Sequence, residues 1–198
     1  LLDGFAARAF RRPLTPSERG RLERLLDRMR AVAGFDETLE TAVLAILQSP
    51  AFLYRSELGE GGGALGPYEL ASAVSFFLTG SMPDEALLAA ARDGQLASGA
   101  DVRREGARLL ATTRGMEQLR HLLDAWLATA RIEDARKDRD RYPELDDGLR
   151  RAMREDVDRY YDEILAGEGS LAALFGETAA WVDGPLARRY GVAPPAEG

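Results

Sequence analysis

The chain contains a single histidine, His121, which precedes Asp124 by three residues. Because residues three apart share one face of a helix, the two side chains could meet. A His–Asp pair activates the nucleophile of many hydrolytic enzymes, and a histidine can also bind a metal ion. Hydrolysis would need a nucleophile, and a metal site would need two or more further ligands. The sequence shows neither a nucleophile nor such ligands at a spacing that indicates a site with His121. The sequence therefore favours a histidine at the surface of a helix or at the edge of its core.

A row of carboxylates forms the second candidate. Glu155, Asp158 and Asp162 follow one another at intervals of three and four residues, so they share one helical face. Such a row could bind a divalent cation or supply paired carboxylates for acid–base catalysis. However, Arg151 and Arg154 stand four residues before Glu155 and Asp158, which is the spacing of ordinary surface ion pairs. We interpret the row as ion-paired and expect no metal site.

Arginines cluster near the beginning of the chain, where residues 8–22 read RAFRRPLTPSERGRL. Arg8, Arg11 and Arg12 precede a proline that ends a helix, and cations at a helix C-terminus can bind its free carbonyls. Phosphate sites favour glycine-rich loops or helix N-termini instead. We interpret these arginines as a structural helix end that pairs with acids such as Glu57. The alternative is a ligand site in a cleft between two helical parts, using Arg8, Arg55, Glu57 and the acidic helix.

The overall composition excludes several functions. A net charge of −7 argues against a general nucleic-acid binder, because such proteins neutralise phosphates. The absence of cysteine excludes disulfides, thiolate zinc sites, iron–sulfur clusters and covalent haem attachment within this chain, and we expect it to hold no cofactor. Its apolar runs are far shorter than the roughly 20 residues that span a bilayer, so we expect no transmembrane segment. Because the chain does not begin with methionine, we expect a piece of a longer protein.

Apolar residues recur at helical spacing along nearly the whole chain, and no alternating run long enough for a strand is present. Thr15 and Glu18 around Pro16 form a capping box, and Ser49 precedes Pro50 in the same manner. The sequence predicts an all-α fold of about nine helices in two packed parts. It also predicts caps at Asp36 and at Ser81 or Met82, a long helix that ends at Gly167, and inward-facing side chains at Leu53, Leu58 and Phe77.

The stretch GEGGGALG at 59–66 is the one flexible linker that the composition suggests. It predicts an N-terminal helical domain over 1–58 and a C-terminal helical domain over 67–192. Residues 193–198 are expected to form an extended tail.

Several stretches resemble two bacterial domains of unknown function. FAARAFRRPLTPSE and LQSPAFLYRSE are similar to family 1595 of planctomycete-type and myxobacterial proteins. YELASAVSFFLTGSMPDEALLAAARDGQL, HLLDAWL, YPELDDGLRRAMREDVDRYYDEIL and LARRYGV resemble its usual neighbour, family 1592. Family 1592 usually has an arginine and a tryptophan where this chain has Ala73 and Thr79, so any site at those positions would differ here.

The resemblance implies context rather than mechanism, because neither family has an established activity. Such proteins are often exported and often carry a c-type cytochrome domain elsewhere in the chain. We therefore expect an uncharacterised helical scaffold or interaction module of a larger extracytoplasmic bacterial protein, whose partners are the other domains of that protein. The alternative is part of a redox or hydrolytic enzyme whose site lies between the two helical parts and works with the cytochrome domain.

Overall fold

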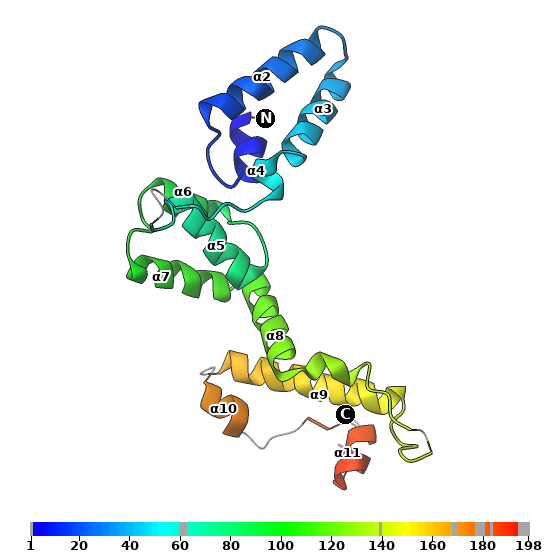
Figure 1. The fold of residues 1–198 in the computed structure, drawn as a ribbon. Coiled ribbons are helices and arrows are strands. Elements are labelled where there is room, and N and C mark those ends of the chain that lie inside the picture. Colours follow the sequence, from blue (N-terminus) through cyan, green and yellow to red (C-terminus); the bar gives the residue numbers. More distant parts are fainter. Residues whose placement is uncertain are drawn as a thin grey trace. The chain divides into compact units, whose positions relative to one another are not determined.

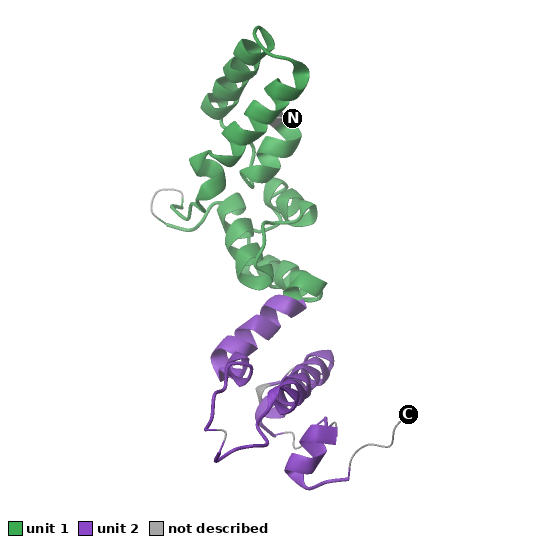
Figure 2. Cartoon of the chain, turned by 90° about the vertical axis from the view of Figure 1, so that its right-hand side faces the viewer, with its two compact units in different colours: residues 1–115 green, residues 116–198 purple. Residues whose placement is uncertain are grey.

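The computed structural model of the chain describes residues 2–59, 63–138, 140–167, 170–176, 181–182 and 184–193. Over these residues every regular element is helical and no strand occurs, which confirms the predicted all-α fold. The chain forms two compact units, Leu1–Gly115 and Met116–Gly198 (Figure 2). Within the described residues, no helix combines the length and the apolar character needed to cross a membrane.

The first unit begins with a small helical group. A π-helical turn, η1 (Leu2–Ala6), continues into α1 (Ala7–Ala9), and α2 (Pro16–Arg30) and α3 (Phe35–Leu47) lie side by side as a hairpin (Figure 1). The short α4 (Pro50–Leu53) follows. Ala6, Phe10, Leu22 and Ile46 are buried together, so η1 and α1 close one end of the hairpin.

Three further helices complete the first unit: α5 (Pro67–Thr79), α6 (Glu85–Arg92) and α7 (Gly99–Leu110). Both α6 and α7 pack against α5, around a core formed by Ala71, Leu87, Ala91, Leu96 and Leu109. Gly106 of α7 faces α5, because a Cβ atom placed there would be in contact with the Leu78 side chain at 3.4 Å. Except for Phe77, the residues predicted to lie on the inner face of α5 therefore pack within this unit.

The longest helix of the second unit is α9 (Asp147–Ala166). It is preceded by α8 (Thr113–Leu127), which begins in the first unit and continues into the second, and by the 3-10 turn η2 (Thr129–Ile132). Gly167 forms the C-cap of α9, as predicted. The short helices α10 (Leu171–Gly176) and α11 (Gly184–Tyr190) complete the unit. Leu174 of α10 joins one apolar cluster with Tyr161 of α9, and Leu186 of α11 joins another with Leu149.

Two predicted caps are confirmed and two are wrong. The capping box of Thr15 is present, and the hydroxyl of Ser49 accepts from the amide of Ala51. The cap expected at Asp36 is instead Gly34, whose carbonyl accepts from the Thr38 hydroxyl at 2.8 Å, and Asp36 lies in the first turn. The cap expected at Ser81 or Met82 is Asp84, because its carboxylate reaches the amide of Leu87 at 2.9 Å.

Three side chains predicted to face inward are exposed: Leu53 by 60%, Leu58 by 80% and Phe77 by 72%. The helix α4 ends at Leu53 and Tyr54 is extended, so no helical face continues to Leu58. Phe77 lies on the side of α5 away from Ala71, which is fully buried. The helical spacing of these residues therefore did not predict whether their side chains face the core or the solvent.

The glycine-rich stretch predicted as a linker lies within the first unit, and the compact units divide at Gly115. The amides of Leu58 and Gly59 both donate to the carboxylate of Glu69 at 3.1 Å, so this end of the stretch is bonded to α5. Residues 60–62 of the stretch and residues 194–198 of the predicted tail lie outside the described residues.

Candidate functional site

Arg11 ends the first helix in an unusual backbone conformation. Its φ angle of 59° lies in the left-handed region. The amide of Arg12 donates to the carbonyl of Ala7 at 3.2 Å and that of Arg11 to the carbonyl of Arg8 at 3.0 Å, which together form a Schellman motif. Glycine usually occupies this position, because a side chain there costs about 1–2 kcal/mol. A compensating interaction of the arginine side chain is therefore expected.

The guanidinium of Arg11 supplies that interaction. Its Nη1 donates to the carbonyls of Ala9 and Phe52, both at 3.2 Å, and its Nη2 to those of Ala51 at 2.8 Å and Tyr54 at 2.9 Å. The residue is only 8% exposed. Arg11 thus binds the free carbonyls where α4 ends, and it fixes the first helix to a segment forty residues later in the chain.

The neighbouring arginines pair with other acids than predicted. Arg12 forms a bidentate pair with Glu18, at 2.9 Å and 2.8 Å. Glu57 was predicted to pair with the arginines at 8–12, but its Oε1 lies 2.7 Å from Nε of Arg55. The two residues are close in an extended segment, so the short local pair forms in preference to a distant one.

Glu18 is held in its charged form by this pair. The hydrogen bonds from Arg12 lower the pKa of Glu18 from 4.5 to about 2, although burial acts in the opposite direction. The amide of Thr15 contributes a further bond at 2.8 Å. The Glu18 side chain is 12% exposed, so solvent screens the pair only in part.

We expect Glu18→Gln to lower the free energy of unfolding by about 2 kcal/mol at neutral pH. The pKa of Glu18 is depressed by folding, so its contribution is present above the unfolded value of 4.5 and is lost as the pH falls toward about 2. Urea denaturation of both proteins across this range should therefore show the difference shrinking with acidification. Glu23→Gln, on the exposed side of the same helix, is the control; a pH-independent difference for Glu18→Gln would contradict the assignment.

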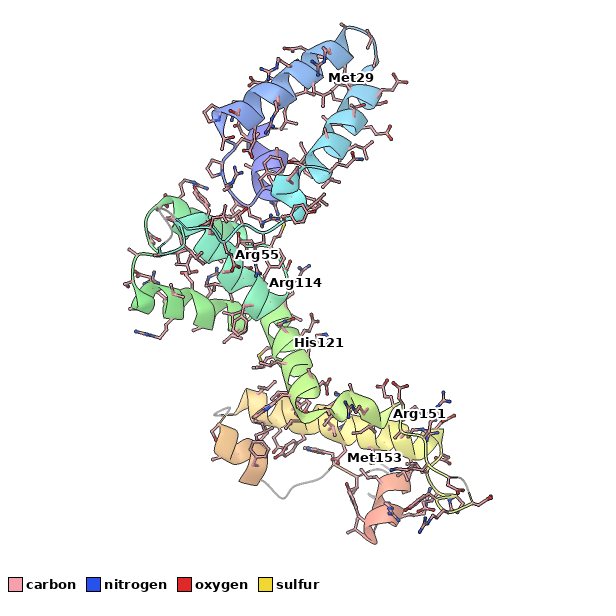
Figure 3. All side chains as sticks on the ribbon, in the orientation of Figure 1. Met29, Arg55, Arg114, His121, Arg151 and Met153 are labelled. Atoms are coloured by element: carbon pink, nitrogen blue, oxygen red, sulfur yellow. The ribbon has the colours of Figure 1, made fainter. Side chains whose placement is uncertain are left out.

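A cavity of about 290 Å³ lies beside Arg11 in the first unit. It is bounded by residues 10–12, by the chain that follows α4 and by the first two turns of α5. Three arginines line it, namely Arg11, Arg12 and Arg55, against one carboxylate, Glu69, and we refer to it as the arginine cavity. Figure 3 labels Arg55 in the segment between α4 and α5.

Positive charge accumulates at this cavity. Burial lowers the pKa of Arg11, and repulsion from Arg12 and Arg55 lowers it further. The guanidinium carbons of Arg55 and Arg11 lie 5.6 Å and 6.0 Å from the centre of the Phe76 ring, within the range of cation–π attraction. One aromatic ring thus helps to hold two like charges near each other.

In the second unit, Asp124 belongs to a network centred on Arg154. Arg154 donates to Asp124 at 2.7 Å and also binds Asp158, the pair predicted from their spacing of four. The hydroxyl of Thr129 donates to Asp124 at 2.6 Å and lies 2.9 Å from the hydroxyl of Tyr161. Burial alone would raise the pKa of Asp124, but the bonds from Arg154 and Thr129 outweigh it and hold that pKa below its usual value.

The remaining sequence candidates are exposed. His121 lies on the solvent side of α8, where Figure 3 labels it, and Glu155 is exposed on α9. Arg8 lines a different cavity, of about 330 Å³, with Asp3 and Arg92. Within the described parts of the chain, no group of three or more histidines and acids could hold a metal ion.

The structure brings Arg55 together with Arg11 and Arg12, but it places Arg8 in a separate cavity. The sequence interpretation missed Ser72, a buried residue of α5 that lines the arginine cavity. No sequence signal marked Ser72. The two positions that depart from the family pattern, Ala73 and Thr79, do not line this cavity, and the Thr79 hydroxyl donates to the Ser75 carbonyl at 2.8 Å.

Comparison with known families matches nearly the whole chain. The model of PSD4, described as a protein of unknown function (DUF1592), matches residues 65–192. The model of PSD5, also described as a protein of unknown function (DUF1595), matches residues 1–57. Both resemblances found in the sequence are therefore confirmed. No curated protein and no solved structure matches the chain.

Proposed function

The chain belongs to the PSD4 family of proteins of unknown function (DUF1592), and on that premise we propose that it is a non-catalytic helical scaffold or interaction module. The observation that carries this proposal is the network around Arg154. Two of the four catalytic candidates, Asp124 and Asp158, are bound by the same guanidinium, and the network fixes α8 to α9 within the second unit. These carboxylates stabilise the fold instead of facing a reactant.

We place the module in a larger bacterial protein that works outside the cytoplasm, where its partners are the other domains of that protein. The support is the resemblance of both segments to domains that commonly occur in such proteins. A c-type cytochrome domain elsewhere in the same protein is part of this proposal. The haem would have to be attached outside this chain, which has no cysteine.

The alternative proposal is part of a redox or hydrolytic enzyme. One observation favours it: the arginine cavity is lined by residues of both family-matched segments, 1–57 and 65–192. The cavity lacks the usual acid–base pair, however, because its one carboxylate, Glu69, accepts hydrogen bonds from the amides of Leu58, Gly59 and Gly66. A carboxylate with three amide donors is a poor base.

A strain that lacks the parent gene and carries a variant copy tests the proposal. The double variant His121→Ala, Glu155→Gln alters two exposed side chains, and we expect it to restore growth or parent activity to within twofold of the unaltered gene. Deletion of the whole module should abolish restoration. Failure of the double variant to restore function, with an unchanged melting temperature, would contradict a scaffold and support the enzyme.

A further inference from the structure

Three arginines but one carboxylate, Glu69, line the arginine cavity of the first unit, and the acids that pair with two of these arginines lie outside the lining. Arg12 forms a bidentate ion pair with Glu18, and Arg55 forms an ion pair with Glu57 through its Nε alone. Arg11 binds only backbone carbonyls, and no carboxylate of the described residues pairs with it. Arg11 is therefore a buried cation without a carboxylate partner among the described residues, and such a cation favours an anion nearby.

The single carboxylate in the lining does not supply that anion. Both oxygens of Glu69 accept backbone amides, from Leu58 at 3.1 Å, Gly59 at 3.1 Å and Gly66 at 3.0 Å. These bonds lower the pKa of Glu69 and direct its charge to the peptide groups at the start of α5. The arginines therefore retain their attraction for another negative group.

Two side chains at the cavity, Arg55 and Ser72, carry donors that have no hydrogen-bond partner among the described residues. Neither terminal nitrogen of Arg55 forms a hydrogen bond with the described residues, although its side chain lies 5.6 Å from the Phe76 ring centre. Ser72 is only 5% exposed and lines the cavity, and its hydroxyl also makes no hydrogen bond to the described residues. The hydroxyl keeps accessible surface although the residue as a whole is buried, so it is open to the cavity and can donate to a bound group.

We propose that this cavity binds the carboxylate of a small organic acid. The fork formed by the two terminal nitrogens of Arg55 matches the two oxygens of a carboxylate, and the Ser72 hydroxyl supplies a third donor. Arg11 contributes positive charge but no free terminal N–H, because all four of these hydrogens are bonded to carbonyls. A phosphate, with more oxygens and more charge, would need more free donors than these. The inference is independent of the scaffold function proposed above.

The apolar part of the lining suits the remainder of such a ligand. Phe10 and Ala51 form part of the wall, and the cavity volume of about 290 Å³ accommodates a molecule of a few carbon atoms. Small-molecule sites typically combine such apolar walls with a few polar groups that fix orientation.

Isothermal titration of the full chain with succinate tests the proposal, with inorganic phosphate as the comparison ligand. We expect succinate to bind, with phosphate at least tenfold weaker. Arg55→Gln should weaken succinate binding by about tenfold or more, and Ser72→Ala by about fivefold, in line with the loss of charged and neutral hydrogen bonds. Arg103→Gln, which removes an equal charge from the exposed side of α7, is the matched control and should leave binding unchanged.

Three results would overturn the proposal. The first is no heat of binding with succinate at millimolar concentrations. The second is equal weakening by Arg55→Gln and Arg103→Gln, which would show a general charge effect. The third is phosphate binding as tight as succinate binding. Melting temperatures of the variants, measured on the same samples, exclude unfolding as the cause of any loss.

Discussion

Replacing Arg11 by alanine is expected to lower the free energy of unfolding of the first unit by about 3 kcal/mol. The substitution removes the shared donor of four carbonyls, those of Ala9, Ala51, Phe52 and Tyr54. It also leaves a side chain at a φ angle of 59°, without the interactions that compensate for that conformation. The loss should appear as a lower midpoint in urea denaturation followed by far-UV circular dichroism.

Arg11→Gly separates the two causes. Glycine loses the same hydrogen bonds but adopts the left-handed region without strain, so this variant should be about 1 kcal/mol more stable than Arg11→Ala. The matched control is Arg8→Ala, an exposed arginine of the same short helix, which should change stability by less than about 0.5 kcal/mol. Equal effects of Arg8→Ala and Arg11→Ala would show that the carbonyl bonds contribute little.

The second large effect is expected for Gly115→Ala, which should destabilise the chain by about 3 kcal/mol. A Cβ atom at this position would overlap the carbonyl oxygen of Leu109 and would lie 2.7 Å from the Cα of Leu110. Both neighbours are backbone atoms, so the tight connection from α7 to α8 would have to open. The amide of Gly115 also donates to the Thr112 hydroxyl at 3.1 Å, and movement would lengthen that bond.

Gly20→Ala is the matched control for this prediction. Gly20 also lies within a helix, but the nearest atom to its added Cβ is the flexible end of Arg24, at 3.3 Å. Alanine should therefore raise stability there by about 0.5–1 kcal/mol, through its better helix propensity. Thermal denaturation of the two variants should give shifts of opposite sign. A stabilising Gly115→Ala would show that the connection is looser than described.

The sequence allowed the helices to be predicted because their determinants are local. The caps at Thr15 and Ser49 were predictable, since each depends on residues within one helical turn. The cap at Asp84 was missed because a proline at the preceding position suggested an earlier start. The sides on which Leu58 and Phe77 lie were also missed, since the length of α4 and the face that α5 buries depend on neighbours distant in sequence.

The candidate sites show the same division between local and distant determinants. The pair of Arg154 and Asp158 follows from a spacing of four, whereas the bond from Arg154 to Asp124 joins residues thirty positions apart. The role of Arg11 was only partly predictable. Its place at a helix end suggested carbonyl binding, but three of its four partners lie in α4 or directly after it, and their position depends on the folded unit.

Both tryptophans of the chain, Trp126 and Trp181, belong to the second unit. The ring of Trp126 meets Phe175 edge-on at 5.9 Å, and Trp181 lies 5.9 Å from the guanidinium of Arg159, so each indole senses the packing of that unit. Indole emission is consequently a built-in optical label for residues 116–198, while circular dichroism records every helix. If the two units unfold separately, a substitution at Arg11 should lower the unfolding midpoint followed by circular dichroism but not the midpoint followed by tryptophan emission. If they unfold together, both midpoints should fall. Comparison of the two signals therefore measures the cooperativity between the units without an added dye.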